Sequence, residues 1–177
     1  MSPRAVILLV LAAALALPAA TAAKADPCAA DQRLVNAWHK VLADNGKITA
    51  RQTAILQEIF RRLSTNQAVP PELFDELRTL VAKNRRQLAA GERRIVLIKP
   101  GTANGRELKR LVLRFIRVVA RPLNNCIGKL LVADTPEKLD AVVQCVDSTS
   151  RARVALSRDV SRSLKRVQAN RSRCARP

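Results

Sequence analysis

The stretch GRELKRLVLRFIRVVAR, residues 105–121, decides the fold of this chain. At about 100° per residue, its five arginines fall within a sector of roughly 80° of a helical wheel. They are Arg106, Arg110, Arg114, Arg117 and Arg121. The residues expected on the far side are Leu108, Leu111, Val112, Phe115, Val118 and Val119. The stretch therefore predicts a helix with one apolar face and one arginine stripe, and the rest of the chain must cover the apolar face.

Apolar residues recur at helical spacing in most of the other segments, and alternating strand patterns are almost absent. With no Tyr, one Trp and three Phe, the core must be built from Leu, Val, Ile and Ala. We expect helices over about 27–45, 49–63, 70–98, 104–121, 123–132 and 136–170. The sequence thus predicts an all-α fold, a single-domain bundle of five to six amphipathic helices stapled by disulfides.

Local signals set the expected helix ends. Asn45-Gly46 ends the first helix, and Pro122 breaks or kinks the helix that carries the arginine stripe. Asn104 is the expected cap of that helix, with a glutamate three residues later. The last expected helix can run to about Asn170 or break near 148–150. Residues 91–100 stay open between helix, strand and loop, although no partner strand is visible and helix is preferred.

The first 25 residues are typical of a secretory signal peptide. A basic residue precedes a continuous apolar run, 5–17, which is too short to span a bilayer comfortably. Two Ala-x-Ala sites follow, and we favour cleavage after Ala25 over retention of the segment as an anchor. We expect residues 1–25 to be removed and residues 26–177 to form one basic helical domain, secreted or held in the periplasm or cell envelope.

All four cysteines, Cys28, Cys126, Cys145 and Cys174, follow this segment. An even number in an exported chain predicts two disulfides, and four cysteines allow three connectivities. Cys126 and Cys145 flank a predicted turn at similar depths, so we hypothesise that they staple a helical hairpin and that Cys28 pairs with Cys174. With no Cys-x-x-Cys and one histidine, we expect no metal site, and no cofactor motif is visible.

The chain is strongly basic. Its net charge is +18, and removal of residues 1–25 leaves about +16, against roughly 2–8 for a soluble small domain. The C-terminal arm, from about residue 150, holds nine basic residues and one acid, Asp159. In a helix, most of these basic side chains form a second stripe. A solvated helix face explains either stripe alone, but two stripes with few acids make a binding surface an equal alternative.

Guanidinium groups bind phosphate and carboxylate groups in bidentate fashion. Nucleic acid fits by charge only, because the chain has few aromatic residues for base stacking and lacks a recognised nucleic-acid motif. Export favours anionic envelope polymers or the lipid headgroups of a membrane surface as partners.

The leading hypothesis is an exported, non-enzymatic helical protein that binds anionic surfaces or polymers. Its expected binding residues are Arg106, Arg110, Arg114, Arg117, Arg121, Arg151, Arg158, Arg162 and Arg166. The alternative is a protein–protein interaction or structural module whose basic faces are solvated or meet an acidic partner. A small secreted hydrolase using His39 is a third hypothesis, but no carboxylate lies three or four residues from His39 to orient it.

Overall fold

The computed structural model describes residues 26–133 and 136–174, apart from the side chains of Pro136, Leu139 and residues 171–174. The described residues form helices and connecting loops, without strands, which confirms the all-α prediction. The elements are α2 (Pro27–Ser64), α3 (Pro71–Leu97), α4 (Ala103–Phe115), the π-helix η1 (Ile116–Ala120), α5 (Arg121–Leu130) and α6 (Pro136–Cys174). The predicted signal peptide, residues 1–25, lies outside the described residues.

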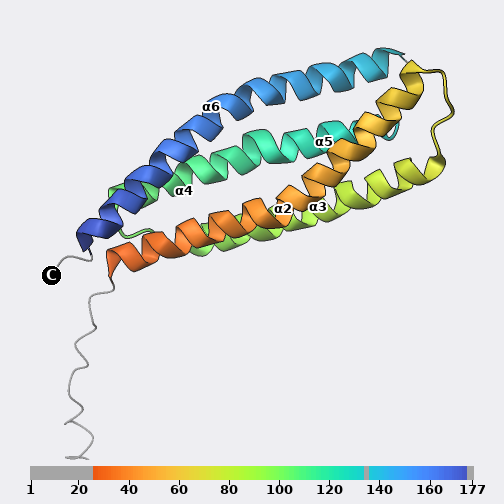
Figure 1. The fold of residues 1–177 in the computed structure, drawn as a ribbon. Helices are drawn as coiled ribbons and strands as arrows, with labels where there is room; N and C mark the ends of the chain where they lie inside the picture. Colours follow the sequence, from red (N-terminus) through yellow and green to blue (C-terminus); the bar gives the residue numbers. More distant parts are fainter. Residues whose placement is uncertain (1–25, 134–135, 175–177) are drawn as a thin grey trace, which may run out of the picture.

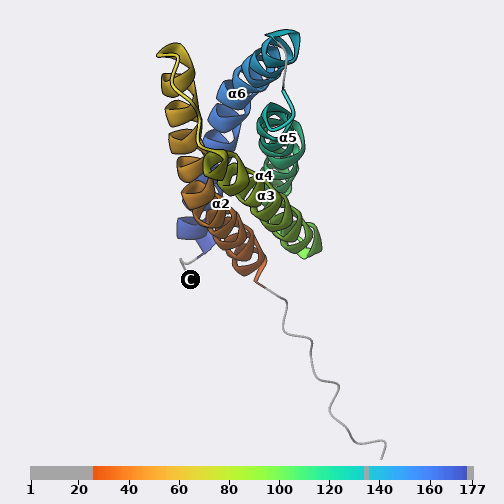
Figure 2. The same cartoon turned by 90° about the vertical axis from the view of Figure 1, so that its right-hand side faces the viewer.

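The described helices form four rods, whose arrangement Figures 1 and 2 show. Helix α4, η1 and α5 follow one another end to end as one rod. Helix α6 packs along this rod, and α2 packs along α3. The predicted five to six helices are therefore too many, because the chain remains helical through two of the expected breaks.

The first expected break lies at Asn45-Gly46, where α2 continues without interruption. Gly46 does not adopt a positive φ, so it is not the left-handed residue that ends many helices. The buried side chains Val41 and Ile48 lie on either side of it and anchor both halves of α2 in the bundle. This packing offsets the intrinsic cost of glycine in a helix, about 1 kcal/mol.

The second expected break, at Pro122, becomes a π-helical turn. Proline has no N–H to donate, and its ring clashes with the carbonyl four residues earlier. The chain adapts because the Arg121 N–H bonds to the carbonyl of Ile116, five residues earlier. The wider turn adds one residue and lets α5 continue the direction of α4.

The loop between α3 and α4 is anchored to α2 by Asp31, a buried carboxylate. Asp31 accepts hydrogen bonds from the Gly101 N–H at 2.9 Å and from the Thr102 hydroxyl. Thr102, not Asn104 as predicted, is the N-cap of α4, and its Oγ1 accepts a hydrogen bond from the Gly105 N–H at 3.0 Å. Gly105 lies directly against the Asp31 carboxylate, so a Cβ there would collide with it. These contacts fix the start of the arginine-bearing rod against α2.

The core consists of two apolar clusters separated by a polar layer. One cluster includes Leu34, Val35, Trp38, Val41, Ile95, Leu108, Leu111, Val112, Ile116, Val160 and Val167. The other contains Ile55, Ile59, Leu77, Val81, Ile127, Leu130 and Val142. Between them, α2, α3 and α5 each contribute one buried amide side chain, Gln52, Asn84 and Asn124. The three amides form a chain of hydrogen bonds across the bundle.

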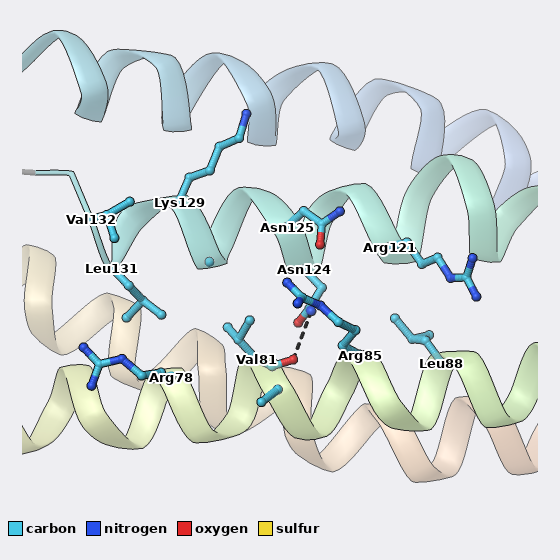
Figure 3. Close-up of a pocket in the computed structure, with 12 residues that line it drawn as sticks. Arg78, Val81, Arg85, Leu88, Arg121, Asn124, Asn125, Lys129, Leu131 and Val132 are labelled. Carbon is cyan, nitrogen blue, oxygen red and sulfur yellow. Dashed lines mark hydrogen bonds between the residues drawn. The ribbon is translucent and has the colours of Figure 1, made fainter.

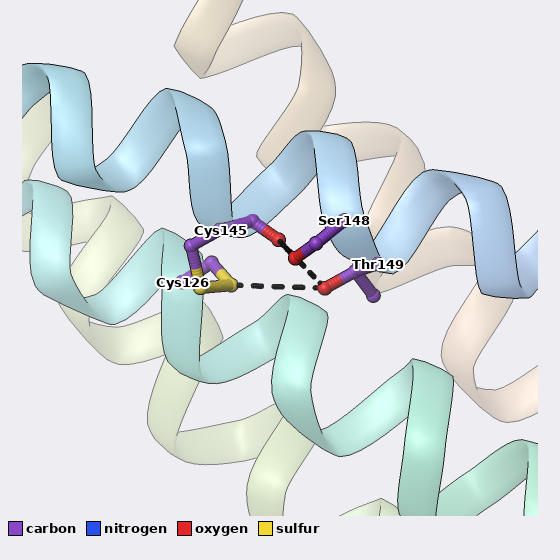
Figure 4. Close-up of a disulfide and its surroundings, with 4 residues drawn as sticks. All are labelled: Cys126, Cys145, Ser148 and Thr149. Atoms are coloured by element: carbon purple, nitrogen blue, oxygen red, sulfur yellow. Dashed lines mark hydrogen bonds between the residues drawn. A yellow bond between two sulfur atoms is a disulfide. The ribbon is translucent and has the colours of Figure 1, made fainter.

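Helix α6 is continuous over 39 residues and has no break near 148–150. The predicted Cys126–Cys145 disulfide is present and joins α5 to α6 (Figure 4). Thr149 lies beside it, with its hydroxyl bonded to the Cys145 carbonyl at 2.7 Å. Cys28 is also disulfide-bonded, but the side chain of Cys174 lies outside the described residues, so the Cys28–Cys174 pair stays a prediction.

Candidate anion-binding surface

The arginine stripe lies on the solvent side of the α4–η1–α5 rod. Arg106, Arg110, Arg114 and Arg117 are exposed, and Arg121 is half-buried. On the opposite side of the rod, Leu108, Leu111, Val112, Ile116 and Val119 are buried. The arginines and most of the apolar residues therefore lie on the sides that the wheel predicts. Val118 is the exception, because it was expected on the apolar face and is 44% exposed.

Acidic side chains bind only some of these arginines. Arg110 bonds to Glu107 one turn earlier, with its Nη2 2.7 Å from Oε1. Arg117 and Arg121 share Glu92 of α3, and the Arg117 Nε lies 2.6 Å from Glu92 Oε1. Because Glu92 is buried and belongs to another rod, it draws the C-terminal end of the stripe toward α3.

The N-terminal end of the stripe borders α6 instead. The pKa of Glu107 is lowered mainly by the hydrogen bond from Arg110 and, to a smaller extent, by the charge of Arg166 on α6. The pKa of Arg110 is raised mainly by Glu107 and also by Asp159 of α6. The arginine stripe and the C-terminal arm therefore meet along the α4–α6 border. The sequence alone did not predict that these two basic surfaces are adjacent.

Within the arm, Arg151, Arg158, Arg162 and Arg166 are all exposed on α6. Arg162 pairs with Asp159 three residues earlier. In the part of the chain that the structure describes, five predicted binding residues form no ion pair: Arg106, Arg114, Arg151, Arg158 and Arg166. Uncompensated arginines on two adjacent rods produce a positive potential over this side of the bundle.

A basic groove lies between α3 and α5 (Figure 3). Its volume is about 870 Å³, and Arg78, Arg85, Arg121 and Lys129 contribute to its lining. No acidic residue is among the residues that line it. We call this feature the basic groove.

Helices α3 and α5 carry these four cations on the two sides of the basic groove, and the Lys129 side chain extends from α5 away from α3 (Figure 3). Arg78 and Arg85 come from α3, and Arg121 and Lys129 come from α5. Asn124 and Asn125 add amide groups to the lining, and Gly128 leaves room where a side chain would project toward Val81. Arg78 is paired with Asp75 and Arg121 with Glu92. Arg85 and Lys129 form no ion pair with any described residue and are available for a ligand.

Sequence reasoning identified Arg121 but missed Arg78, Arg85 and Lys129. The spacing of Arg78 and Arg85, seven residues apart, was a usable signal because it places both on one face of a helix. The packing of α3 beside α5 could not be predicted from the sequence, because it depends on how the rods pack and not on a local pattern.

His39 is exposed on α2 and does not line the basic groove. Among the described residues, no group of three or more His, Cys, Asp or Glu side chains could hold a metal ion. The described helices include none with the length and apolar character needed to span a bilayer.

Comparison with known protein families, curated proteins and solved structures found no match to this chain.

Proposed function

We propose that this protein is an exported, non-enzymatic helical module that binds a linear anionic polymer. The observation that carries the proposal is the basic groove, in which four cationic side chains and no acidic ones line a volume of about 870 Å³. A guanidinium group binds phosphate or carboxylate through two parallel hydrogen bonds. Arg85 on one wall and Lys129 on the other can contact successive anionic groups of one chain.

The rest of the surface supports the same proposal. The arginine stripe and the C-terminal arm surround the α4–α6 border with unpaired arginines, which attract a polyanion from a distance. A groove favours a flexible chain over a flat lipid surface, because its walls contact a strand from two sides. A signal peptide over residues 1–25 would carry the domain out of the cytoplasm, where anionic envelope polymers are available.

The experiment measures binding of the oxidised protein to four anionic ligands: inorganic polyphosphate, polygalacturonate, vesicles that contain phosphatidylglycerol, and duplex DNA. Each is tested at low and at high salt, about 50 mM and about 500 mM NaCl. We expect binding to one or both of the flexible polymers, with a slope of log K against log salt of roughly −2 to −4. Stronger binding to vesicles or to duplex DNA than to either polymer would contradict the proposal.

Two charge-reversed variants locate the site. Arg85→Glu with Lys129→Glu alters the basic groove, whereas Arg33→Glu with Lys47→Glu makes the same change in net charge on exposed positions of α2. We expect the groove variant to weaken polymer binding by at least about tenfold and the control by no more than about threefold. Equal losses would show that net charge, and not the basic groove, determines binding. Absence of binding at low salt would favour an acidic protein partner or a solvated surface.

A further inference from the structure

Helices α2 and α6 pack together at one end of the bundle and separate toward the other. Near the start of α2, Leu34 and Trp38 share an apolar cluster with Val160 and Val167 of α6. Further along, the two helices diverge (Figure 2). A cavity of about 580 Å³ lies in this part of the bundle, lined by α2, α3, the α4–η1–α5 rod and Arg153 of α6. We call the two helix surfaces beside this cavity, residues 42–63 of α2 and 140–157 of α6, the open seam.

Large apolar side chains are exposed along the open seam. Five of them are 43–62% accessible: Leu42, Phe60, Leu63, Val143 and Val154. Leu42 lines the cavity. Phe60 follows the lining residues Thr53 and Gln57 by seven and three residues, so it lies on the same side of α2. Apolar side chains gathered on one exposed surface mark an interaction site.

The end of the bundle that carries most of the open seam differs in charge from the rest of the chain. The end of α2, the start of α3, the end of α5 and the start of α6 lie together there (Figure 1). Residues 51–80 and 129–147, which form this end, hold eight acidic and six basic residues, although the whole chain holds 14 acidic and 32 basic ones. The positive charge that keeps copies of the chain apart is therefore concentrated elsewhere, and a second copy can approach this end without strong repulsion.

The two sides of the open seam also carry opposite charges. Residues 136–150 of α6 contain three acidic residues and one basic residue, whereas residues 51–64 of α2 contain three basic residues and one acidic residue. Asp140 and Asp147 are exposed and share the face of α6 that carries Val143, because they lie three residues before it and four after it. In a dimer with a two-fold axis, α6 of each copy can face α2 of the other, which pairs opposite charges at both contacts.

From these observations we propose that a second copy of this chain covers the open seam, so that the protein forms an isologous dimer. Two helix faces, each about 25–30 Å long and about 10 Å wide, would bury roughly 1,000–1,200 Å² over both copies. That area is at the lower limit of specific interfaces, so we expect a Kd of roughly 1–100 μM. The basic groove is lined by residues of α3, α5 and the turn after α5, so the proposal does not depend on polymer binding there.

The experiment is sedimentation velocity of the full oxidised protein without polymer, over about 1–300 μM in about 150 mM NaCl. We expect a reversible equilibrium between monomer and dimer. A single monomeric species over the whole range would overturn the proposal and leave the open seam to a different partner. Assemblies that grow beyond the dimer would also overturn it, because a two-fold interface closes at two copies.

A pair of double variants locates the interface. Phe60→Glu with Val143→Glu alters both sides of the open seam at exposed positions. Val96→Glu with Leu97→Glu makes the same chemical change at exposed positions near the end of α3, at the other end of the bundle. Both lower the net positive charge equally, so neither adds overall repulsion, and both should keep their helical circular dichroism. We expect the first to raise the dimer Kd by at least about tenfold and the second by less than about threefold. Equal effects would refute the assignment of the interface.

A second pair tests the charge complementarity. Asp140→Asn with Asp147→Asn removes two acids beside Val143, whereas Glu72→Gln with Asp75→Asn removes two exposed acids from α3, outside the open seam. The α6 variant should raise the dimer Kd by about three- to tenfold and the α3 variant by less than about twofold. A larger effect of the α3 variant would contradict the pairing of α6 with α2 of the second copy.

Discussion

Two glycines of the long helices should respond in opposite directions to the same substitution. Gly46 lies within α2 and Gly91 within α3. An added Cβ at Gly46 would meet no atom within 4 Å, whereas one at Gly91 would lie 2.5 Å from Cγ2 of the buried Val41. Gly91 therefore allows α3 to approach α2 closely, while Gly46 has no packing role.

The magnitudes follow from these surroundings. Gly46→Ala should raise the free energy of unfolding by about 0.5–1 kcal/mol, because alanine loses less backbone entropy than glycine when it becomes helical. Gly91→Ala gains the same stabilisation from backbone entropy. However, the new methyl group must displace the Val41 side chain or separate α2 from α3, which costs about 1–3 kcal/mol in a packed core. Its net effect should be a loss of about 1–2 kcal/mol.

The assay is thermal and urea unfolding followed by circular dichroism, with the disulfides intact. At about 2–4 °C per kcal/mol for a domain of this size, Gly46→Ala should melt about 1–4 °C higher and Gly91→Ala about 2–8 °C lower. Destabilisation by Gly46→Ala would refute the continuous α2, because alanine costs about 1–2 kcal/mol in the left-handed conformation of a helix end. Stabilisation by Gly91→Ala would refute the close packing of α3 on α2.

Three further predictions concern stability. Asp31→Ala should lower the free energy of unfolding by about 3 kcal/mol, because it removes the buried carboxylate that accepts hydrogen bonds from the α3–α4 loop. The control is Asp44→Ala, which loses only partly exposed ion pairs and should cost less than about 1 kcal/mol. Urea unfolding measures both. Replacing Cys126 and Cys145 together by alanine should lower the free energy of unfolding, measured in the same assay, by about 3 kcal/mol or more, because the disulfide joins residues 19 positions apart. A loss below about 1 kcal/mol would contradict a stabilising role of this disulfide. Hydrogen bonds from Arg61 and, to a smaller extent, from Arg62 lower the pKa of Glu58 to about 2. The ionised Glu58 side chain therefore stabilises the fold fully above its ordinary pKa of 4.5, and this stabilisation is lost as the pH falls toward 2. Glu58→Gln should therefore lower the melting temperature slightly at pH 6 and not at pH 2, and an equal difference at both pH values would contradict this account.

The helical class and the positions of several helix starts were readable from local patterns. Apolar residues at helical spacing identified most of the buried face of α4. Asp26, directly before Pro27, caps α2 and accepts a hydrogen bond from the Cys28 N–H at 2.8 Å. The Cys126–Cys145 staple followed from the expected hairpin. These features depend on neighbours in the sequence, so sequence alone contains them.

The failures occurred where packing outweighs a local rule. Asn45-Gly46 has the composition of a helix end, but buried residues on both sides keep α2 helical through it. Pro122 removes a hydrogen bond, but a π-turn restores one with a different partner. The basic groove depends on which rods lie side by side, and neither a helical wheel nor residue spacing predicts that arrangement.

The most direct test of the central claim is a ¹⁵N NMR titration of the oxidised protein with short-chain polyphosphate at low salt. Binding in the basic groove predicts that the largest amide shifts fall near Arg85 on α3 and near Gly128 and Lys129 on α5. It also predicts that these shifts disappear in the Arg85→Glu, Lys129→Glu variant. Shifts spread evenly over the basic residues of all four rods, or centred on α2, would contradict the account.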